Sequence, residues 1–341
     1  MAKRSTVTMK DIAASLNVST GLVSYVLNGR GDEMRISKEM QRRVHEKATE
    51  MNYRPNLYAK RVRQSVAYCP TFSIFWPYQS DAELLNAVFS GIHDLMIYNP
   101  VEFDIMLHLY ERHRLSQYGR YFNGARSDGA LICNFPTNDG DFIENNQFPI
   151  PIVLMNRHST VHSCAYVNPE IYIQQTAELA FQAGITTIGL LYADNNTSHH
   201  TQAELWRECC AKAGILLRTY SAQYPISEDG GARATAEMLR NNNQPPELLI
   251  ALSKRLARGA QYLLRKAGIT ESAFPKLLVV TNQLQRQDPT LAAWSAIQLP
   301  IDKMCNWCIS HLLTTMPNQA PEAREFQAEW FLNDDFFYKK A

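Results

Sequence analysis

The chain has 341 residues, a formal net charge of +1 and seven cysteines. No apolar run approaches the roughly 18–20 residues needed to span a membrane, and no apolar stretch follows the first residues, so we expect neither a membrane protein nor an exported one. The odd number of cysteines, scattered without a framework spacing, indicates a reducing environment and a cytoplasmic protein.

Residues 8–28 are predicted to form two short helices joined by a turn. The apolar residues of the first helix recur at helical spacing, and they are Met9, Ile12, Ala13 and Leu16. Thr8 and Asp11 have the spacing of a capping box, and Ser19 is expected to cap the second helix. Two helices this close, with a polar outer face on the second, are typical of the helix-turn-helix that lays one helix in the DNA major groove.

The second helix is expected to turn Val23, Val26 and Leu27 inward. The residues left on its outer face are Thr20, Gly21, Ser24, Tyr25 and Asn28. A third helix is predicted from Ser37. Its apolar side is formed by Met40, Val44, Ala48 and Met51. Three helices of this size can close a small core.

Charge is distributed unevenly along the chain. Residues 1–63 carry thirteen Lys and Arg against six Asp and Glu, a balance of +7, so the remainder must carry −6. A basic segment of this kind is the electrostatic signature of a phosphate binder. We therefore expect the N-terminal segment to bind DNA and the acidic remainder not to bind it.

The residues after position 65 exceed what one core usually supports, so two subdomains are expected. Strands are predicted at Phe72–Trp76, Phe103–Leu109, Gly129–Cys133, Ile152–Met155, Thr187–Tyr192, Leu248–Leu252 and Leu277–Val280. Helices are predicted at Glu83–Ile97, Ile171–Ala183, Ala203–Ala213, Arg233–Arg240, Lys254–Lys266 and Asp302–Met316. This alternation indicates an α/β core of parallel sheets covered on both faces.

Five short motifs carry a family resemblance: Asp11-Ile12-Ala13, Val18-Ser19, Val23-Ser24, Val26-Leu27-Asn28-Gly29 and Tyr53-Arg54-Pro55-Asn56. Together they resemble the headpiece of the LacI/GalR family of bacterial transcription regulators. The resemblance is dense over residues 7–63 and continues more weakly to about residue 332. It implies a three-helix headpiece, a hinge helix from Asn56 to about Arg63, and a core of two doubly wound subdomains like a periplasmic sugar-binding protein.

The resemblance also implies a domain organisation. The headpiece is expected over residues 1–52 and the hinge helix and linker over 53–65. The N-terminal subdomain is expected over 66–167 plus 300–325, and the C-terminal subdomain over 168–299 plus 326–341. The chain is then expected to cross between subdomains near Val167, Leu299 and Phe326. No leucine heptad follows the last strand, so a homodimer is expected rather than a tetramer.

In the family a dimer reads a near-palindromic operator in double-stranded DNA. The residues expected to contact DNA are Thr8, Ser19, Thr20, Gly21, Ser24, Tyr25, Asn28, Arg35, Ser37, Tyr53, Asn56, Ala59, Lys60, Val62 and Arg63. Gly21 either lets the backbone approach the groove closely or marks a position that the operator does not test. Tyr25 cannot grip guanine with two bonds as Arg does, so the operator is expected to differ from the common half-site.

Val62 stands where relatives usually carry a Leu that wedges into the central base step. As a wedge it would give a shallower kink or require a more easily opened operator centre. Alternatively, Val62 only packs against its dimer mate. Operator affinity and bending of Val62→Ala and Val62→Leu decide between these two interpretations.

The expected effector cleft departs most from sugar-responsive relatives. Where these carry Arg, an Asn-Asp pair and Asp, this chain has Gln202, Ser253-Lys254 and Gln283. The effector is therefore not expected to be a typical neutral sugar. Three interpretations are open. The effector is an anion attracted by Lys254 and Arg157, or the cleft is vestigial. In the third, Ser253 is only a helix cap and Lys254 a solvated side chain. The cleft candidates are Tyr78, Arg157, Gln202, Ser253, Lys254 and Gln283.

We therefore expect a DNA-binding regulator under the control of a small molecule of unknown class, and the resemblance implies that it acts as a repressor. The alternative is a regulator whose vestigial cleft leaves control to a protein partner. No phosphate loop, zinc-protease motif or catalytic constellation is visible, so no enzyme, cofactor or metal is expected. Cys305-x-x-Cys308 lies in a helical stretch without a second pair, which indicates core packing.

Overall fold

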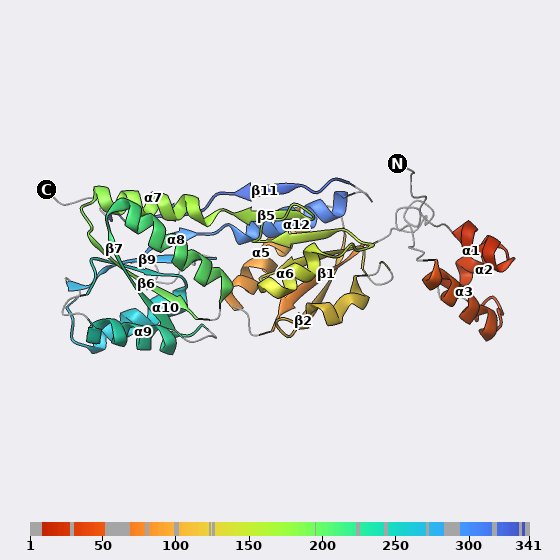
Figure 1. Ribbon diagram of the computed structural model, residues 1–341, viewed down its shortest axis with the longest axis horizontal. Coiled ribbons are helices and arrows are strands. Elements are labelled where there is room, and N and C mark those ends of the chain that lie inside the picture. The colour runs from red at the N-terminus through yellow and green to blue at the C-terminus, as the bar shows by residue number, and fades with distance from the viewer. Residues whose placement is uncertain are drawn as a thin grey trace.

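The computed structural model describes most of the chain, and the fold below refers to these residues. They are 9–27, 31–51, 69–78, 82–98, 102–122, 124, 127–194, 196–222, 226–241, 245–270, 273–282, 294–315, 319–333 and 336–337. They form a three-helix headpiece and an α/β core with two sheets (Figure 1). None of the described helices is long and apolar enough to cross a lipid bilayer.

The headpiece consists of α1 (Met9–Leu16), α2 (Thr20–Leu27) and α3 (Lys38–Glu50). Asn17, between the first two helices, has φ = +53°, a left-handed conformation that Asn tolerates better than most residues. The core contains the inward residues of all three helices, as the helical spacing predicts. Its fully buried members are Ile12, Ala13, Val23, Val26, Val44 and Ala48.

The first sheet of the core has six strands in the order β11-β5-β4-β3-β1-β2, and all pairs are parallel. The strands are β1 (Thr71–Pro77), β2 (Asp104–Tyr110), β3 (Gly129–Cys133), β4 (Ile152–Met155), β5 (Ser163–Val167) and β11 (Ala323–Phe326). The strand order reverses at β1, which has β2 on one side and β3 on the other. Ligands bind doubly wound sheets beyond the carboxyl ends of the strands beside such a reversal.

The second sheet repeats this order as β12-β10-β9-β8-β6-β7. Its strands are β6 (Thr187–Ala193), β7 (Leu216–Ala222), β8 (Leu248–Ala251), β9 (Lys276–Thr281), β10 (Ser295–Gln298) and β12 (Glu329–Phe331). All pairs are parallel except β10 with β12, which is antiparallel. The expected fold class, two doubly wound α/β subdomains behind a helix-turn-helix headpiece, is therefore confirmed.

Helices cover both faces of each sheet (Figure 1). Those of the first subdomain are α5 (Ala82–Tyr98), the 3₁₀ helix η1 (Leu115–Tyr121), α6 (Thr137–Glu144) and α12 (Ile301–Thr314). Those of the second are α7 (Pro169–Gln182), α8 (Thr197–Ala213), α9 (Glu228–Asn241) and α10 (Lys254–Lys266). Cys305 and Cys308 are fully buried on α12, so the predicted core packing of this pair is confirmed.

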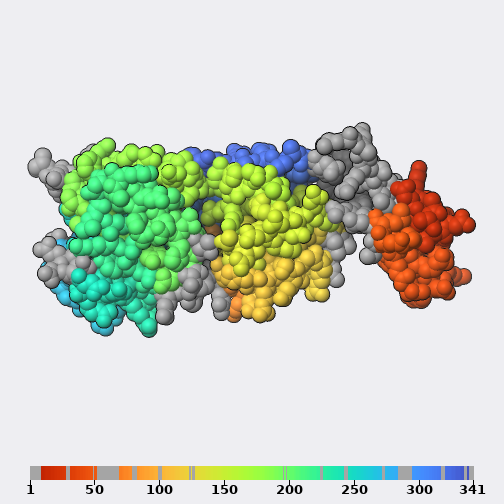
Figure 2. Space-filling view, in the orientation of Figure 1, coloured from red at the N-terminus to blue at the C-terminus, as the bar shows by residue number. Residues whose placement is uncertain are grey.

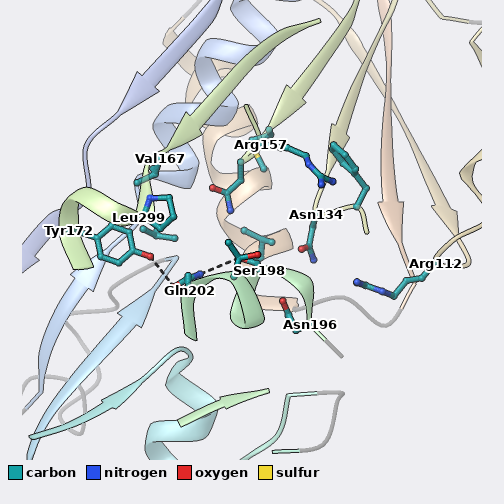
Figure 3. A pocket seen from close by; sticks show the side chains of 15 residues that line it. Arg112, Asn134, Arg157, Val167, Tyr172, Asn196, Ser198, Gln202 and Leu299 are labelled. Carbon is teal, nitrogen blue, oxygen red and sulfur yellow. Dashed lines mark hydrogen bonds between the residues drawn. The ribbon is translucent and has the colours of Figure 1, made fainter. Parts of the chain in front are cut away.

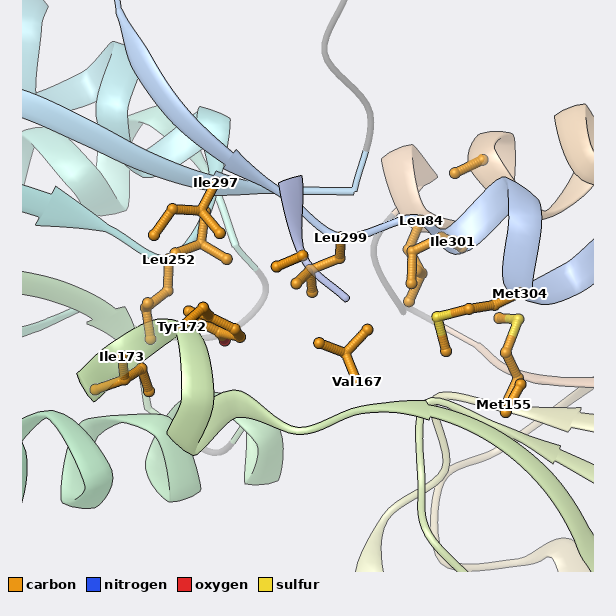
Figure 4. Packing of buried hydrophobic residues seen from close by; sticks show 14 of the residues in the cluster. Leu84, Met155, Val167, Tyr172, Ile173, Leu252, Ile297, Leu299, Ile301 and Met304 are labelled. Atoms are coloured by element: carbon orange, nitrogen blue, oxygen red, sulfur yellow. The ribbon is translucent and has the colours of Figure 1, made fainter. Parts of the chain in front are cut away.

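The chain passes between the two subdomains three times. It crosses between β5 and α7, between β10 and α12, and between β11 and β12. One apolar cluster runs continuously through both subdomains past these crossings, and Figure 4 shows Val167 and Leu299 between the two halves of it. The crossings are thus embedded in apolar packing and not in a solvated linker.

Five strands escaped the sequence analysis: β5, β7, β10, β11 and β12. Three of them, β7, β11 and β12, lie at sheet edges, where one side of the strand has no neighbour to bury it. The β11 sequence Ala-Arg-Glu-Phe is almost wholly exposed, so it shows no apolar alternation. β10 has only four residues and begins with a polar one, Ser295. For the three edge strands, backbone pairing and not a hydrophobic pattern defines the strand.

Candidate DNA interface and effector cleft

The outward face of α2 carries the side chains predicted to read DNA. Thr20, Gly21 and Tyr25 are exposed, Ser24 is half-buried, and Val23 is buried beneath them. The Ser19 hydroxyl accepts a hydrogen bond from the amide of Leu22 at 3.2 Å and so caps the helix start. The helix is therefore held by its apolar side and leaves a small, mostly uncharged surface for a groove.

Gly21 has open space around it. A Cβ placed there would meet only the Ser19 Oγ atom, at 3.9 Å. The protein itself therefore does not require glycine at this position. Two explanations for glycine therefore stay open: the operator does not test this position, or the DNA approaches the backbone closely there.

Arg35 lies in the segment between α2 and α3. Arg35 is exposed and has φ = +54°, a left-handed conformation that is uncommon for a long side chain. Asp32 fixes the segment, because its carboxylate accepts hydrogen bonds from Lys38 Nζ at 2.7 Å and Gln41 Nε2 at 2.8 Å. The bond from Lys38 is the main cause of the lowered pKa of Asp32. Ser37 is exposed and caps α3 through the amide of Met40 at 3.3 Å.

Several predicted site residues lie outside the described residues, and their expected roles stay predictions. They are Thr8, Asn28, Tyr53, Asn56, Ala59, Lys60, Val62, Arg63 and Gln283. The hinge helix belongs to this group, so the wedge hypothesis for Val62 rests on the sequence alone.

The core contains a cavity of about 280 Å³ between its two subdomains. Figure 2 shows the surface hollowed between them, and Figure 3 shows the cavity from close by. The described residues that line it are Leu84, Arg112, Asn134, Phe135, Met155, Asn156, Arg157, Val167, Pro169, Tyr172, Asn196, Ser198, Thr201, Gln202 and Leu299. Its place, beyond the carboxyl ends of β2, β3 and β4, is where doubly wound folds bind ligands.

The wall from the first subdomain combines apolar side chains with polar and cationic ones. Arg112 follows β2, and the side chain of Asn134, which follows β3, lies between those of Arg112 and Arg157 in Figure 3. Asn134 and Asn156 have φ values of +49° and +60°, so both strands end in a left-handed turn. Such strained positions cluster at functional sites, where they direct side chains.

Asp139 anchors the loop that carries Arg112. Its buried carboxylate accepts hydrogen bonds from the amides of His113 at 3.0 Å and Leu115 at 3.1 Å. This carboxylate on α6 therefore fixes the path of the chain directly after Arg112. Neither Asp139 nor Arg112 was predicted as a site residue, since no local pattern in the sequence links Asp139 to a loop more than twenty positions earlier.

The wall from the second subdomain is polar and uncharged. The Tyr172 hydroxyl donates a hydrogen bond to Gln202 Oε1 at 2.9 Å, and Gln202 Nε2 donates one to Ser198 Oγ at 3.1 Å (Figure 3). Asn196 caps α8 by accepting a hydrogen bond from the amide of His199 at 3.2 Å. Gln202 thus lines the cavity, as expected, within a hydrogen-bonded chain that ties α7 to α8.

Two of the predicted cleft residues, Arg157 and Gln202, line this cavity, whereas three others lie elsewhere. Tyr78 is 62% exposed and turns its side chain to solvent. Ser253 is buried and accepts a hydrogen bond from the amide of Arg255 at 3.1 Å, so it is the cap of α10. Its interpretation as a helix cap therefore replaces its interpretation as a cleft residue.

Lys254 is neither a cleft residue nor a solvated side chain. Its side chain is 4% exposed, and Nζ lies 3.4 Å from Glu83 Oε2 of α5, whose side chain is 25% exposed. The two residues belong to different subdomains, so the ion pair bridges them at the first turns of α10 and α5. The attraction that the sequence analysis assigned to an anionic effector acts on a carboxylate of the protein.

A helix-turn-helix headpiece joined to a periplasmic-binding-protein-like core defines a class of DNA-binding transcription regulators. The family model described as "Bacterial regulatory proteins, lacI family" matches residues 8–56. The Sucrose operon repressor of Klebsiella pneumoniae is 26% identical over 275 residues, which cover 75% of this chain and 77% of that protein. Residues 8–56 thus match the lacI family of bacterial regulatory proteins, and the chain is similar to LacI/GalR regulators over most of its length.

Further similarities agree with this assignment. The transcriptional regulator MalR of Streptococcus pneumoniae is 29% identical over 153 residues, which cover 43% of this chain and 45% of that one. A LacI-family regulator from Clostridium acetobutylicum has a TM-score of 0.69 at 19% identity and covers 78% of this chain and 100% of its own. The Lac repressor dimer bound to operator and the anti-inducer ONPF has a TM-score of 0.63 at 16% identity, covering 96% and 98%. These structures share the fold.

Proposed function

We propose that this protein is a repressor that binds a near-palindromic operator as a homodimer, under the control of a small molecule in the cavity between its subdomains. The proposal is carried by two features that occur in one chain: an exposed polar face on α2, and a ligand-sized cavity between two subdomains that the chain joins by three crossings. Repression is supported by the name of the sucrose operon relative. The seven cysteines, all free, support a cytoplasmic location.

A homodimer is supported by an apolar surface on the first subdomain. On the outer face of α5, Phe89, Met96 and Ile97 are exposed at helical spacing. In the adjoining edge strand β2, Leu107 and Leu109 are exposed too, and they pair in register with buried residues of β1. Contiguous exposed apolar residues of this kind mark protein–protein interfaces. The partner that covers this surface is a second copy of this chain, because a two-fold symmetric operator is bound by a two-fold symmetric dimer.

The proposed mechanism is a ligand-linked hinge motion. A ligand that contacts both walls of the cavity favours the closed arrangement of the subdomains, because it binds that state better. In a dimer held through the first subdomain, closure changes how the two headpieces are presented to DNA. The ligand either releases or strengthens operator binding, according to which state the DNA prefers.

A selection experiment tests this function. The purified full-length protein is incubated with random duplex DNA, and bound sequences are recovered over a range of salt concentrations. We expect a two-fold symmetric consensus whose binding weakens steeply with salt, because Lys and Arg release counterions from phosphates. Recovery of no symmetric sequence would contradict operator binding. If operator binding responds to a protein captured by the core and to no small molecule, control by the cavity is wrong.

A further inference from the structure

We infer that the ligand of the cavity is a small anion, a carboxylate or a phosphate ester, held by Arg112 and Arg157. The inference rests on the proposed function, since it names the chemical class of the molecule that the cavity would take. Three observations carry it: the charge of the lining residues, the contacts that hold the Arg157 guanidinium, and the position of the α8 N-terminus at the cavity.

The charge of the described lining residues has one sign. Arg112 and Arg157 reach the cavity from loops after two different strands, and no described lining residue is an Asp or Glu. Both arginines are only partly exposed, so water screens them less than it screens surface charges. Arginine offers a planar fork of donors that matches carboxylate and phosphate oxygens.

Arg157 is held in a fixed place by its neighbours. Its guanidinium Cζ lies 5.0 Å from the centre of the Phe135 ring, which is a cation–π distance. The guanidinium also lies close to Gly140 of α6, where an added Cβ would come within 2.7 Å of Arg157 Nη1 and 3.1 Å of Phe135 Cε2. Gly140 thus leaves the space that the guanidinium occupies. A side chain that its neighbours hold in place loses less freedom when it binds a ligand.

The opposite wall offers a second set of anion-binding groups. The 17-residue helix α8 begins at the cavity with Asn196 as its cap, and Ser198 and Thr201 line the cavity from its first turns. A helix N-terminus favours negative charge, and acidic residues often supply it. The first turn of α8 has no acidic residue. An anion that is bound to the arginines therefore gains a further favourable interaction when the subdomains close.

Isothermal titration calorimetry of the full-length protein tests the inference with four probes. These are inorganic phosphate, glucose 6-phosphate, gluconate and glucose, of which the last three share a carbon skeleton and differ in charge. We expect an anionic probe to bind at least about tenfold more tightly than glucose, because it gains charge-assisted hydrogen bonds. The phosphate and carboxylate probes distinguish the two sources of negative charge.

Matched variants test the residues. Arg112→Gln and Arg157→Gln are expected to weaken anion binding about tenfold or more, while Arg120→Gln, an exposed arginine of the same subdomain, leaves it unchanged. Gly140→Ala is expected to displace the Arg157 guanidinium, because the added Cβ would come within 2.7 Å of Nη1, and so to weaken anion binding while the charge is kept. This last variant separates positioning of the charge from its removal.

The inference is overturned if glucose binds as tightly as the anions, if none of the four probes binds, or if both arginine variants behave like Arg120→Gln. Operator binding, measured separately, keeps the two proposals distinguishable. A neutral probe that binds and alters operator affinity overturns the anion inference alone. An anion that binds through the arginines without changing operator affinity overturns cavity control alone.

Discussion

The headpiece and the cleft are built in different ways. In the headpiece the exposed face of α2 and the core beneath it are set by helical spacing within about forty residues of sequence. In the cleft, Arg112, Asn134, Arg157, Ser198 and Leu299 come from five separate segments and meet because the sheets are wound and crossed as they are. A local pattern is thus sufficient for the first site, whereas the second depends on the whole topology. Changes confined to one region should therefore leave the other intact.

Ile12→Ala is expected to have the largest effect. Ile12 is fully buried, and the described part of the headpiece has a core of six buried hydrophobic residues, so truncation should destabilise this domain by about 2–5 kcal/mol. Operator binding should be lost, while ligand binding and the melting of the core stay unchanged. Gel-shift titration and differential scanning calorimetry measure both. Glu39→Ala, an exposed change on α3, is the control, and retention of operator affinity by Ile12→Ala would contradict the prediction.

Acid is expected to destabilise the core through His199, which is buried in the first turn of α8. Its Nδ1 accepts a hydrogen bond from the amide of Ala193 at 3.0 Å, and burial lowers the pKa of His199 from 6.5 to about 4. Between these values the unfolded chain takes up a proton that the native chain does not. Stability therefore falls as the pH falls from 6.5 to 4, by about 3 kcal/mol in all.

Urea unfolding of the core at several pH values measures this loss. His199→Gln should flatten the dependence, whereas His200→Gln, a change at the exposed neighbouring histidine, should leave it steep. An equally steep loss in both variants would mean that His199 is not the group responsible.

Glu83→Gln is expected to have a smaller effect on the bridge between subdomains. The change leaves the buried Lys254 ammonium facing a neutral amide. Breaking a buried pair is strongly destabilising, but Glu83 is one quarter exposed, so we expect a loss of about 1–3 kcal/mol. Thermal unfolding of the core measures it, with Glu208→Gln on the outside of α8 as the control. Adding Lys254→Met should restore part of the loss, and no recovery would contradict this account.

Gly21→Ala is expected to have the smallest effect, and to stabilise. Alanine favours a helix by about 1 kcal/mol over glycine, and the site has room for the methyl group. Headpiece melting should therefore rise. A lower melting temperature would contradict the open space around Gly21. Operator affinity then decides between the two interpretations of this position, since a loss indicates close backbone approach and no change indicates that the operator does not test it.

The sequence predicts the headpiece well because its signals are local. The caps at Ser19 and Ser37 and the buried positions of all three helices follow from spacing alone. In the core the central strands are recognisable, since strands buried on both faces are continuous apolar runs. Edge strands such as β11 carry no such signal.

The cleft could be predicted only in part. Arg157 and Gln202 were found because they follow a recognisable strand or occupy a family position, but Arg112 lies in a loop with nothing to mark it. For Lys254 the position at the start of α10 could be predicted from the sequence. Its ion pair with Glu83 could not, because the two residues are 171 positions apart and meet only in the folded chain.

The two late crossings have a consequence for how the protein is made. Strand β11, which completes the first sheet beside β5, is the last strand of that sheet to leave the ribosome. Helix α12 covers one face of the same sheet, and it too is synthesised after every strand of the second sheet except β12. Until then the nascent first subdomain has an open edge and a bare apolar face, which are the features that invite aggregation. Synthesis thus passes through a long vulnerable interval, during which we expect chaperones that shield apolar surfaces to bind.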